Sequence, residues 1–167
     1  MNIIQSTWAY KIKRFPDRLV RKLKARFYVR GDMQIEGVDF FNTFAPVVQW
    51  VTVRLLLNLS ITLDLETVQV DYVSAFCQAP IEEGVYVELP RGWQTLKSIG
   101  IKVDFKEDHV LKLNQSLYGL RQFPRNFFLY LKGNLEKAGL RQSKMDPCLF
   151  ISDHVVPRPC GLLCLRR

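Results

Sequence analysis

Alternation of apolar and polar residues is the strongest pattern near the start of the chain. Two runs with a period of two residues predict a β-hairpin over Trp8–Arg30. Pro16-Asp17 lies between the runs and supplies a turn, because proline presets the backbone and aspartate tolerates tight turns. The apolar positions of the two predicted strands are Trp8, Tyr10, Ile12, Leu23, Ala25, Phe27 and Val29.

The same alternation gathers positive charge on the other face of this hairpin. The cations of the return strand are Lys22, Lys24, Arg26 and Arg30, and the outgoing strand can add Lys11 and Lys13. Like charges that face each other across a sheet repel unless an anion lies over them. The face therefore favours phosphate, whereas a solvated strand face would explain either charge run taken alone.

Two segments have the spacing of helices. Val47–Leu63 follows Ala45-Pro46 and is predicted to be a core helix packed on the sheet. Pro124–Gly139 is the best helix in the chain, with a proline suited to its first turn and a glycine suited to its end. Its apolar stripe consists of Phe127, Phe128, Leu131, Leu135 and Ala138.

A further alternating run lies in the middle of the chain. Val68 and Val70 alternate with Gln69 and Asp71, which predicts a strand with one buried face that ends at Asp71. A turn or short helix through Ala75-Phe76 is expected next. A carboxylate at a strand end with an aromatic residue just past it fits a metal and nucleotide corner, and a strand-end aspartate without chemistry is the alternative. Shorter strands are expected at Val85–Leu89, Val110–Leu113 and Asp146–Ile151.

The excess of basic residues in the composition indicates a polyanionic partner. The 167 residues carry a formal net charge of +8, which suits nucleic acid first and an anionic membrane second. The first 31 residues hold nine basic residues and one acidic residue, whereas residues 60–92 hold six acids and one arginine. No run of 18 apolar residues and no apolar signal-peptide core occurs, so an intracellular protein, cytoplasmic or nuclear and not secreted, is expected.

Six motifs in one order resemble the reverse transcriptase domain of Ty1/copia-type retrotransposons. They are WAYKIKRFPD, KLKARFYVRG, QIEGVDFFNTFAPVV, VDYVSAFCQAPIEEGVYVELPRGW, LKLNQSLYGLRQFPRNF and SKMDPCLFIS. The resemblance implies an α+β fold, namely a partial right-hand polymerase of fingers and palm with an antiparallel sheet, packed helices and no thumb. It also implies an RNA template, a DNA primer and a deoxynucleoside triphosphate as partners.

The resemblance also assigns roles to single residues. Asp71 would be the catalytic carboxylate and a Mg²⁺ ligand, and Phe76 would be the sugar-excluding gate. Lys24 and Arg26 would lie near the triphosphate and template, with Arg121 and Gln122 beside the nucleotide and template. Where the family has alanine and a Trp-Tyr pair, this chain has Phe123 and Phe127-Phe128, which puts an unaltered pocket in doubt.

The family pattern stops after Ile151, where a strand, a turn and a Tyr-x-Asp-Asp motif would be expected. Residues 1–151 are therefore interpreted as a fingers–palm fragment and 152–167 as an aberrant or disordered tail. Nucleotide addition uses two Mg²⁺ ions about 4 Å apart, and Asp71 alone cannot hold both. The expected function is that of an RNA-directed DNA polymerase fragment without activity of its own, and the alternatives are a non-enzymatic nucleic-acid-binding remnant or a pseudogene product.

Overall fold

A computed structural model describes residues 1–70, 72, 74–95, 100, 109–152 and 163–164. It is a mixed α+β chain that divides into two units, residues 1–43 with 76–126 and residues 44–75 with 127–167. Asp71 lies outside the described residues, and the side chain of Phe76 is not described. No helix among the described residues is long and apolar enough to cross a membrane.

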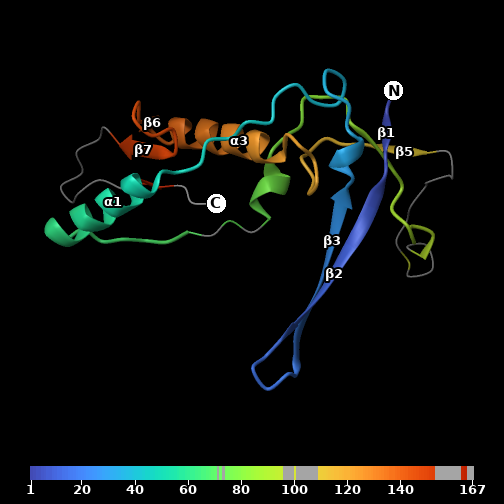
Figure 1. The fold of residues 1–167 in the computed structure, drawn as a ribbon, viewed down its shortest axis with the longest axis horizontal. Helices are drawn as coiled ribbons and strands as arrows, with labels where there is room; N and C mark the ends of the chain where they lie inside the picture. Colours follow the sequence, from blue (N-terminus) through green and yellow to red (C-terminus); the bar gives the residue numbers. More distant parts are fainter. Residues whose placement is uncertain (71, 73, 96–99, 101–108, 153–162, 165–167) are drawn as a thin grey trace. The chain divides into compact units, whose positions relative to one another are not determined.

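The first unit contains the predicted hairpin. Its strands are β2 (Ser6–Arg14) and β3 (Val20–Val29), which pair antiparallel and form the long blue arm in Figure 1. The predicted turn is confirmed: the Asp17 carboxylate accepts the backbone N–H of Leu19, and Phe15 and Arg18 close the turn through their backbones. The hairpin was predictable because every contact that defines it is local.

A small three-stranded sheet carries the core of the first unit. It consists of β1 (Ile3–Ile4), β4 (Tyr86–Glu88) and β5 (Val110–Lys112), in the order β1-β4-β5. β4 and β5 are antiparallel, as expected, but β1 joins β4 in parallel, so the prediction of a wholly antiparallel sheet is wrong for this pair. The buried apolar cluster is Ile4, Val29, Val85, Val87, Leu113, Leu120 and Phe123.

The second unit holds two helices and another small sheet. Its elements are α1 (Trp50–Thr62), the larger part of α3 (Phe123–Lys137), β6 (Leu140–Gln142), β7 (Leu149–Ser152) and β8 (Leu163–Cys164). Leu131, Leu135 and Phe150 form its buried cluster. The strand predicted over Asp146–Ile151 and the helix predicted over Pro124–Gly139 are both present. β8 pairs with β7, and the interpretation of 152–167 as an aberrant tail stays a prediction.

Two predictions for the second unit are wrong. Residues 65–70 form no strand, and the side chain of Val68 is 83% exposed. The helix α1 is not a core helix, since Thr52 is its one buried residue and Ile61 is 81% exposed. The patterns describe apolar residues that can be buried, but burial needs a partner. Among the described residues no strand pairs with residues 65–70.

Asp146 ties the start of α1 to the loop before β7. Its buried carboxylate accepts hydrogen bonds from the Thr52 hydroxyl at 2.6 Å, the Gln49 N–H at 3.1 Å and the Cys148 N–H at 2.8 Å. Burial raises the pKa of Asp146, but these hydrogen bonds outweigh it, so the pKa lies below the ordinary aspartate value. A carboxylate at a helix N-terminus is also favoured by the helix dipole.

Candidate nucleic-acid interface

The register of the hairpin brings five cations to one face. Lys11 lies directly opposite Lys24, Lys13 lies opposite Lys22, and Arg26 lies opposite the small Ala9. Side chains directly opposite on an antiparallel pair lie on one face with their Cβ atoms about 5 Å apart. We call Lys11, Lys13, Lys22, Lys24 and Arg26 the basic face, and the prediction of a shared face is confirmed for these five residues.

Mutual repulsion is visible within this face. The charge of Lys13 lowers the pKa of Lys24 most, followed by desolvation and the charges of Arg26 and Lys22. No acidic residue of β2 or β3 neutralises this charge, since the two strands contain none. An anion placed over the basic face would offset this repulsion, because a nearby opposite charge favours the charged form of Lys24.

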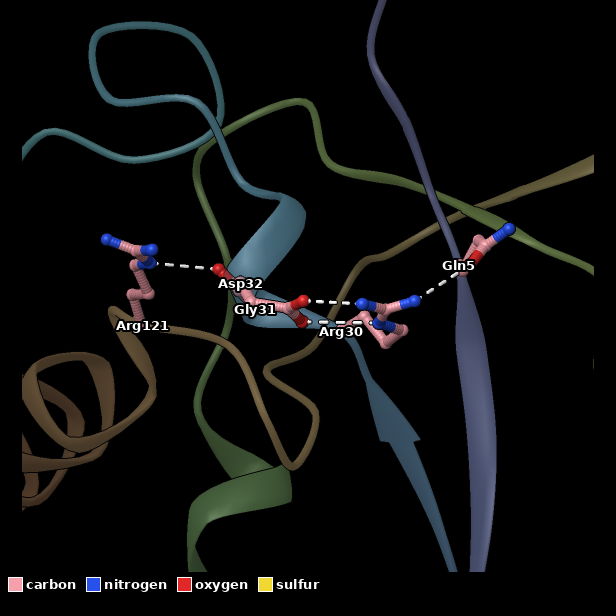
Figure 2. Close-up of polar contacts among 5 residues, drawn as sticks. All are labelled: Gln5, Arg30, Gly31, Asp32 and Arg121. Atoms are coloured by element: carbon pink, nitrogen blue, oxygen red, sulfur yellow. Dashed lines mark hydrogen bonds and ion pairs between the residues drawn. The ribbon is translucent and has the colours of Figure 1, made fainter.

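Arg30 was predicted to lie on the basic face, but the structure does not place it there. β3 ends at Val29, and Arg30 makes an ion pair with Asp32 whose N–O distance is 2.6 Å. Its guanidinium also donates to the Gln5 side chain at 3.2 Å, as Figure 2 shows. The hydrogen bond from Arg30 lowers the pKa of Asp32. The charge of Arg30 is thus directed to a local carboxylate.

A pair of aromatic residues, Tyr28 and Tyr118, lies next to the basic face where the hairpin meets the loop of residues 117–122. Tyr28 and Tyr118 form a parallel bridge, their rings lie 5.5 Å apart, and Tyr118 accepts the Val29 N–H at 2.8 Å. The guanidinium carbon of Arg26 lies 5.7 Å from the centre of the Tyr118 ring. This distance is within the range of a cation–π contact.

Two glycines allow this close approach. A Cβ atom on Gly119 would collide with the carbonyl oxygen of Val29, and a Cβ atom on Gly31 would collide with the carbonyl oxygen of Gly119. Gly119 also has a φ of 96°, which side-chain-bearing residues rarely adopt. The end of β3 and the loop of residues 117–122 therefore cross at backbone contact, and glycine is needed on both sides.

Arg121 lies in the same loop, two residues after Gly119. Its Nε donates to the Gly31 carbonyl at 2.8 Å, and its guanidinium carbon lies 5.4 Å from the centre of the Phe40 ring. Figure 2 shows the terminal nitrogens of the exposed Arg121 side chain pointing away from Gly31 and Asp32. These nitrogens make no hydrogen bond to the described residues, so they are available to an anion.

The side chain of Gln122 is buried in a hydrogen-bond network, and its predicted place beside the nucleotide and template stays a prediction. Its side chain is 0% exposed; the Oε1 atom accepts from Gln34 at 2.9 Å, and the Nε2 atom donates to the Asp39 carbonyl at 2.9 Å. The Gln34 Oε1 atom in turn accepts the Arg121 N–H at 2.8 Å. Gln122 therefore holds the loop of residues 117–122 in place and presents no side-chain atom to a ligand.

Asp71 and Phe76 are the remaining predicted site residues. Asp71 falls outside the described residues, and for Phe76 the structure gives only its place in a short 3-10 helix, Ala75–Gln78. Among the described residues no three His, Cys, Asp or Glu side chains gather to hold a metal ion.

Sequence reasoning missed several residues of this surface. Tyr118, Gly31 and Gln34 were not singled out, although all three contact predicted site residues or their neighbours. Their partners lie about 90 residues away in the chain, and alternation reports only neighbours within a strand or helix. The glycine in Leu117–Arg121 was the one available signal, because glycine permits close backbone approach.

Comparison with known proteins places these residues in a family. A model of the family described as reverse transcriptase (RNA-dependent DNA polymerase) matches residues 1–156. The chain is 35% identical over 147 residues to the retrovirus-related Pol polyprotein from transposon TNT 1-94 of Nicotiana tabacum, covering 88% of this chain and 10% of that protein. It is 30% identical over 151 residues to the Pol polyprotein from transposon RE1 of Arabidopsis thaliana, covering 90% and 10%.

A yeast relative extends the comparison. The chain is 31% identical over 149 residues to the Transposon Ty1-ER2 Gag-Pol polyprotein of Saccharomyces cerevisiae, covering 80% of this chain and 8% of that protein. No solved structure matches. The chain thus spans about a tenth of the length of each of these three relatives.

Proposed function

Because this chain belongs to the reverse transcriptase (RNA-dependent DNA polymerase) family, as a domain of copia-type retrotransposon Pol polyproteins, we propose that it forms fingers and part of the palm of a right-hand polymerase. Its basic face would bind phosphates of the RNA template, the DNA primer or the incoming deoxynucleoside triphosphate. The hairpin would be the finger that carries Lys24 and Arg26.

The observation that carries this proposal is the cross-strand pairing of lysines. Lys11 with Lys24 and Lys13 with Lys22 place like charges opposite each other along β2 and β3. Such pairs destabilise a sheet in the absence of an anion. A surface that accepts this cost is best explained by a polyanion that binds to it, and phosphate is the anion that nucleic acid and nucleotides share.

Arg121 supports the same proposal from the loop of residues 117–122. Its exposed guanidinium can donate to a phosphate in a fork geometry that lysine lacks. Gln122 would contribute by fixing the backbone of this loop through Gln34 and Asp39. We retain Phe76 as the proposed sugar gate on the strength of the family motif alone.

Mg²⁺ is the proposed cofactor, with Asp71 as one ligand. When bound, the ion supplies charge stabilisation at the transferred phosphoryl group. The described residues provide no further ligand cluster, so we assign no step to the metal. The polypeptide of these 167 residues is proposed to bind nucleic acid without extending a primer by itself.

Binding to a labelled RNA–DNA primer–template tests the proposal. Removal of two phosphate contacts by Lys24→Ala with Arg26→Ala should weaken binding about 25- to 60-fold near 0.1 M salt, because counter-ion release contributes about 0.7–0.9 logarithmic units per contact. The matched control is Lys137→Ala with Lys144→Ala, which removes the same charge from exposed positions of the second unit. Equal losses in both double variants would mean that net charge, not the basic face, binds the nucleic acid.

Primer extension separates this function from the alternative of a binding remnant. The remnant would bind through the same face but would show no magnesium-dependent synthesis even when supplied with the rest of a copia-type polymerase. A polymerase fragment would contribute to synthesis in that reconstituted enzyme, and the contribution would depend on Asp71.

A further inference from the structure

Tyr118 is the residue that joins the basic face to the loop of residues 117–122. Its ring lies under the guanidinium of Arg26, at 5.7 Å from ring centre to guanidinium carbon. The Arg26 side chain makes no hydrogen bond or ion pair to other described residues. Among the described residues, the Tyr118 ring is thus the side-chain group that this guanidinium contacts.

The Tyr118 ring is itself held firmly. It packs at 5.5 Å and 42° against Tyr28 and at 5.2 Å and 51° against Phe123. Tilted packing of this kind is the favoured arrangement for aromatic pairs. The backbone of Tyr118 is bonded to Val29, and the next residue is the glycine that crosses the end of β3. The ring is thus fixed from the hairpin and from the start of α3.

We propose that Tyr118 is a positioning residue for phosphate binding by Arg26. The guanidinium carbon lies over the ring, and within the described residues no N–H donor of Arg26 is used in a hydrogen bond, so these donors stay available for an anion. An arginine already held in this way loses less rotamer freedom when it binds. This inference rests on the proposed function and assigns to Tyr118 a role that acts through Arg26, without contact to the nucleic acid.

Lys24 provides an internal control for the proposal. It lies on the same face, two residues before Arg26, and it is half-buried like Arg26. Its charged neighbours are the cations Lys13, Arg26 and Lys22, and within the described part of the chain it contacts no aromatic ring. A change at Tyr118 should therefore alter the contribution of Arg26 and leave the contribution of Lys24 intact.

The experiment measures binding of the full chain to a labelled RNA–DNA primer–template in three backgrounds: wild type, Arg26→Ala and Lys24→Ala. Tyr118→Leu removes the ring, and Tyr118→Phe retains it. We expect Tyr118→Leu to weaken binding about two- to fivefold in the wild-type and Lys24→Ala backgrounds, which is the strength of an exposed cation–π contact. No further loss is expected in the Arg26→Ala background, and Tyr118→Phe should bind like the wild type.

Leucine also removes packing against Tyr28 and Phe123, so a second variant keeps the shape of the ring. A phenylalanine with a fully fluorinated ring at position 118 has nearly the same size but lacks the negative ring face. We expect it to weaken binding about two- to fivefold relative to phenylalanine, again in the presence of Arg26 only.

Three outcomes would overturn the proposal. Equal losses from Tyr118→Leu in all three backgrounds would show a purely structural role. Unchanged binding of the fluorinated variant, with Arg26→Ala clearly weaker than wild type, would show that the ring does not position Arg26. Unchanged binding of Arg26→Ala itself would refute the phosphate role of Arg26, and the role of Tyr118 would fall with it.

Discussion

Replacement of Gly119 by alanine should loosen the junction between the hairpin and the loop of residues 117–122. Gly119 has a φ of 96°, and a Cβ atom there would collide with the Val29 carbonyl oxygen. The backbone conformation costs about 1–3 kcal/mol for a residue with a side chain. The collision forces the loop away from β3, which breaks the bond from the Val29 N–H to the Tyr118 carbonyl.

Loss of that bond leaves a buried donor without its partner at a cost of about 1–3 kcal/mol. The two effects together predict a loss of about 2–6 kcal/mol in the unfolding free energy of the first unit, by summing these ranges. Because whole domains are stable by only about 5–15 kcal/mol, Gly119→Ala should bring the first unit close to unfolding.

Hydrogen exchange at the Val29 amide is the direct assay, since that amide donates to Tyr118. Two other glycines serve as controls. Gly37 also has a positive φ, of 79°, but nothing lies within 4 Å of a Cβ placed there, so Gly37→Ala should show the backbone cost alone. Gly133 lies in the interior of α3 with open space around it, and Gly133→Ala should stabilise the helix by about 1 kcal/mol.

The reasoning would be refuted if Gly119→Ala left Val29 exchange and stability within about 0.5 kcal/mol of wild type, which is the usual size of a neutral surface substitution. A loss in Gly119→Ala no larger than in Gly37→Ala would refute the collision while keeping the backbone cost.

Three further predictions concern other parts of the chain. The pKa of Asp146 is lowered in the folded state, so its contribution to the free energy of unfolding is complete above the unfolded-state pKa of about 4 and disappears as pH falls through the lower folded-state pKa. Urea titrations between pH 7 and 2 should show this loss of stability, and Asp146→Asn should make the stability less dependent on pH over the same range. Gln122→Leu leaves the Gln34 amide and the Asp39 carbonyl without their partner, so unfolding experiments should show a loss of about 1–3 kcal/mol. The purified 167-residue polypeptide should not extend a primer on an RNA template with Mg²⁺, and synthesis above background that is lost in Asp71→Asn would contradict this.

Local patterns predicted the parts of the fold that local contacts determine. The hairpin and α3 follow from periods of two and about four residues, and the basic face follows from the same period. Pairing between distant segments was not visible in this way: β1 consists of two residues that join β4 about 80 residues later. The burial of α1 and the strand at residues 65–70 were predicted wrongly. An apolar pattern indicates which residues can be buried, but their burial depends on a partner segment.

In the candidate site, too, the residues that local patterns determine were predictable, and the contacts between distant segments were not. Lys24 was found from alternation, and its cross-strand partner Lys11 was expected on the same face. Gln122 was assigned by family resemblance to a place beside the nucleotide, but its position in a buried amide network depends on Gln34, 88 residues distant in the chain. The contact of Arg26 with Tyr118 depends likewise on a crossing that only the folded chain reveals.

The salt dependence of nucleic-acid binding tests the central claim most directly. The logarithm of the association constant for an RNA–DNA primer–template should fall linearly with the logarithm of salt concentration, and Lys24→Ala with Arg26→Ala should reduce the slope by about 1.4–1.8 for two lost phosphate contacts. The control pair Lys137→Ala and Lys144→Ala should leave the slope unchanged. A slope that is the same in wild type and in the Lys24/Arg26 double variant would contradict phosphate binding by the basic face.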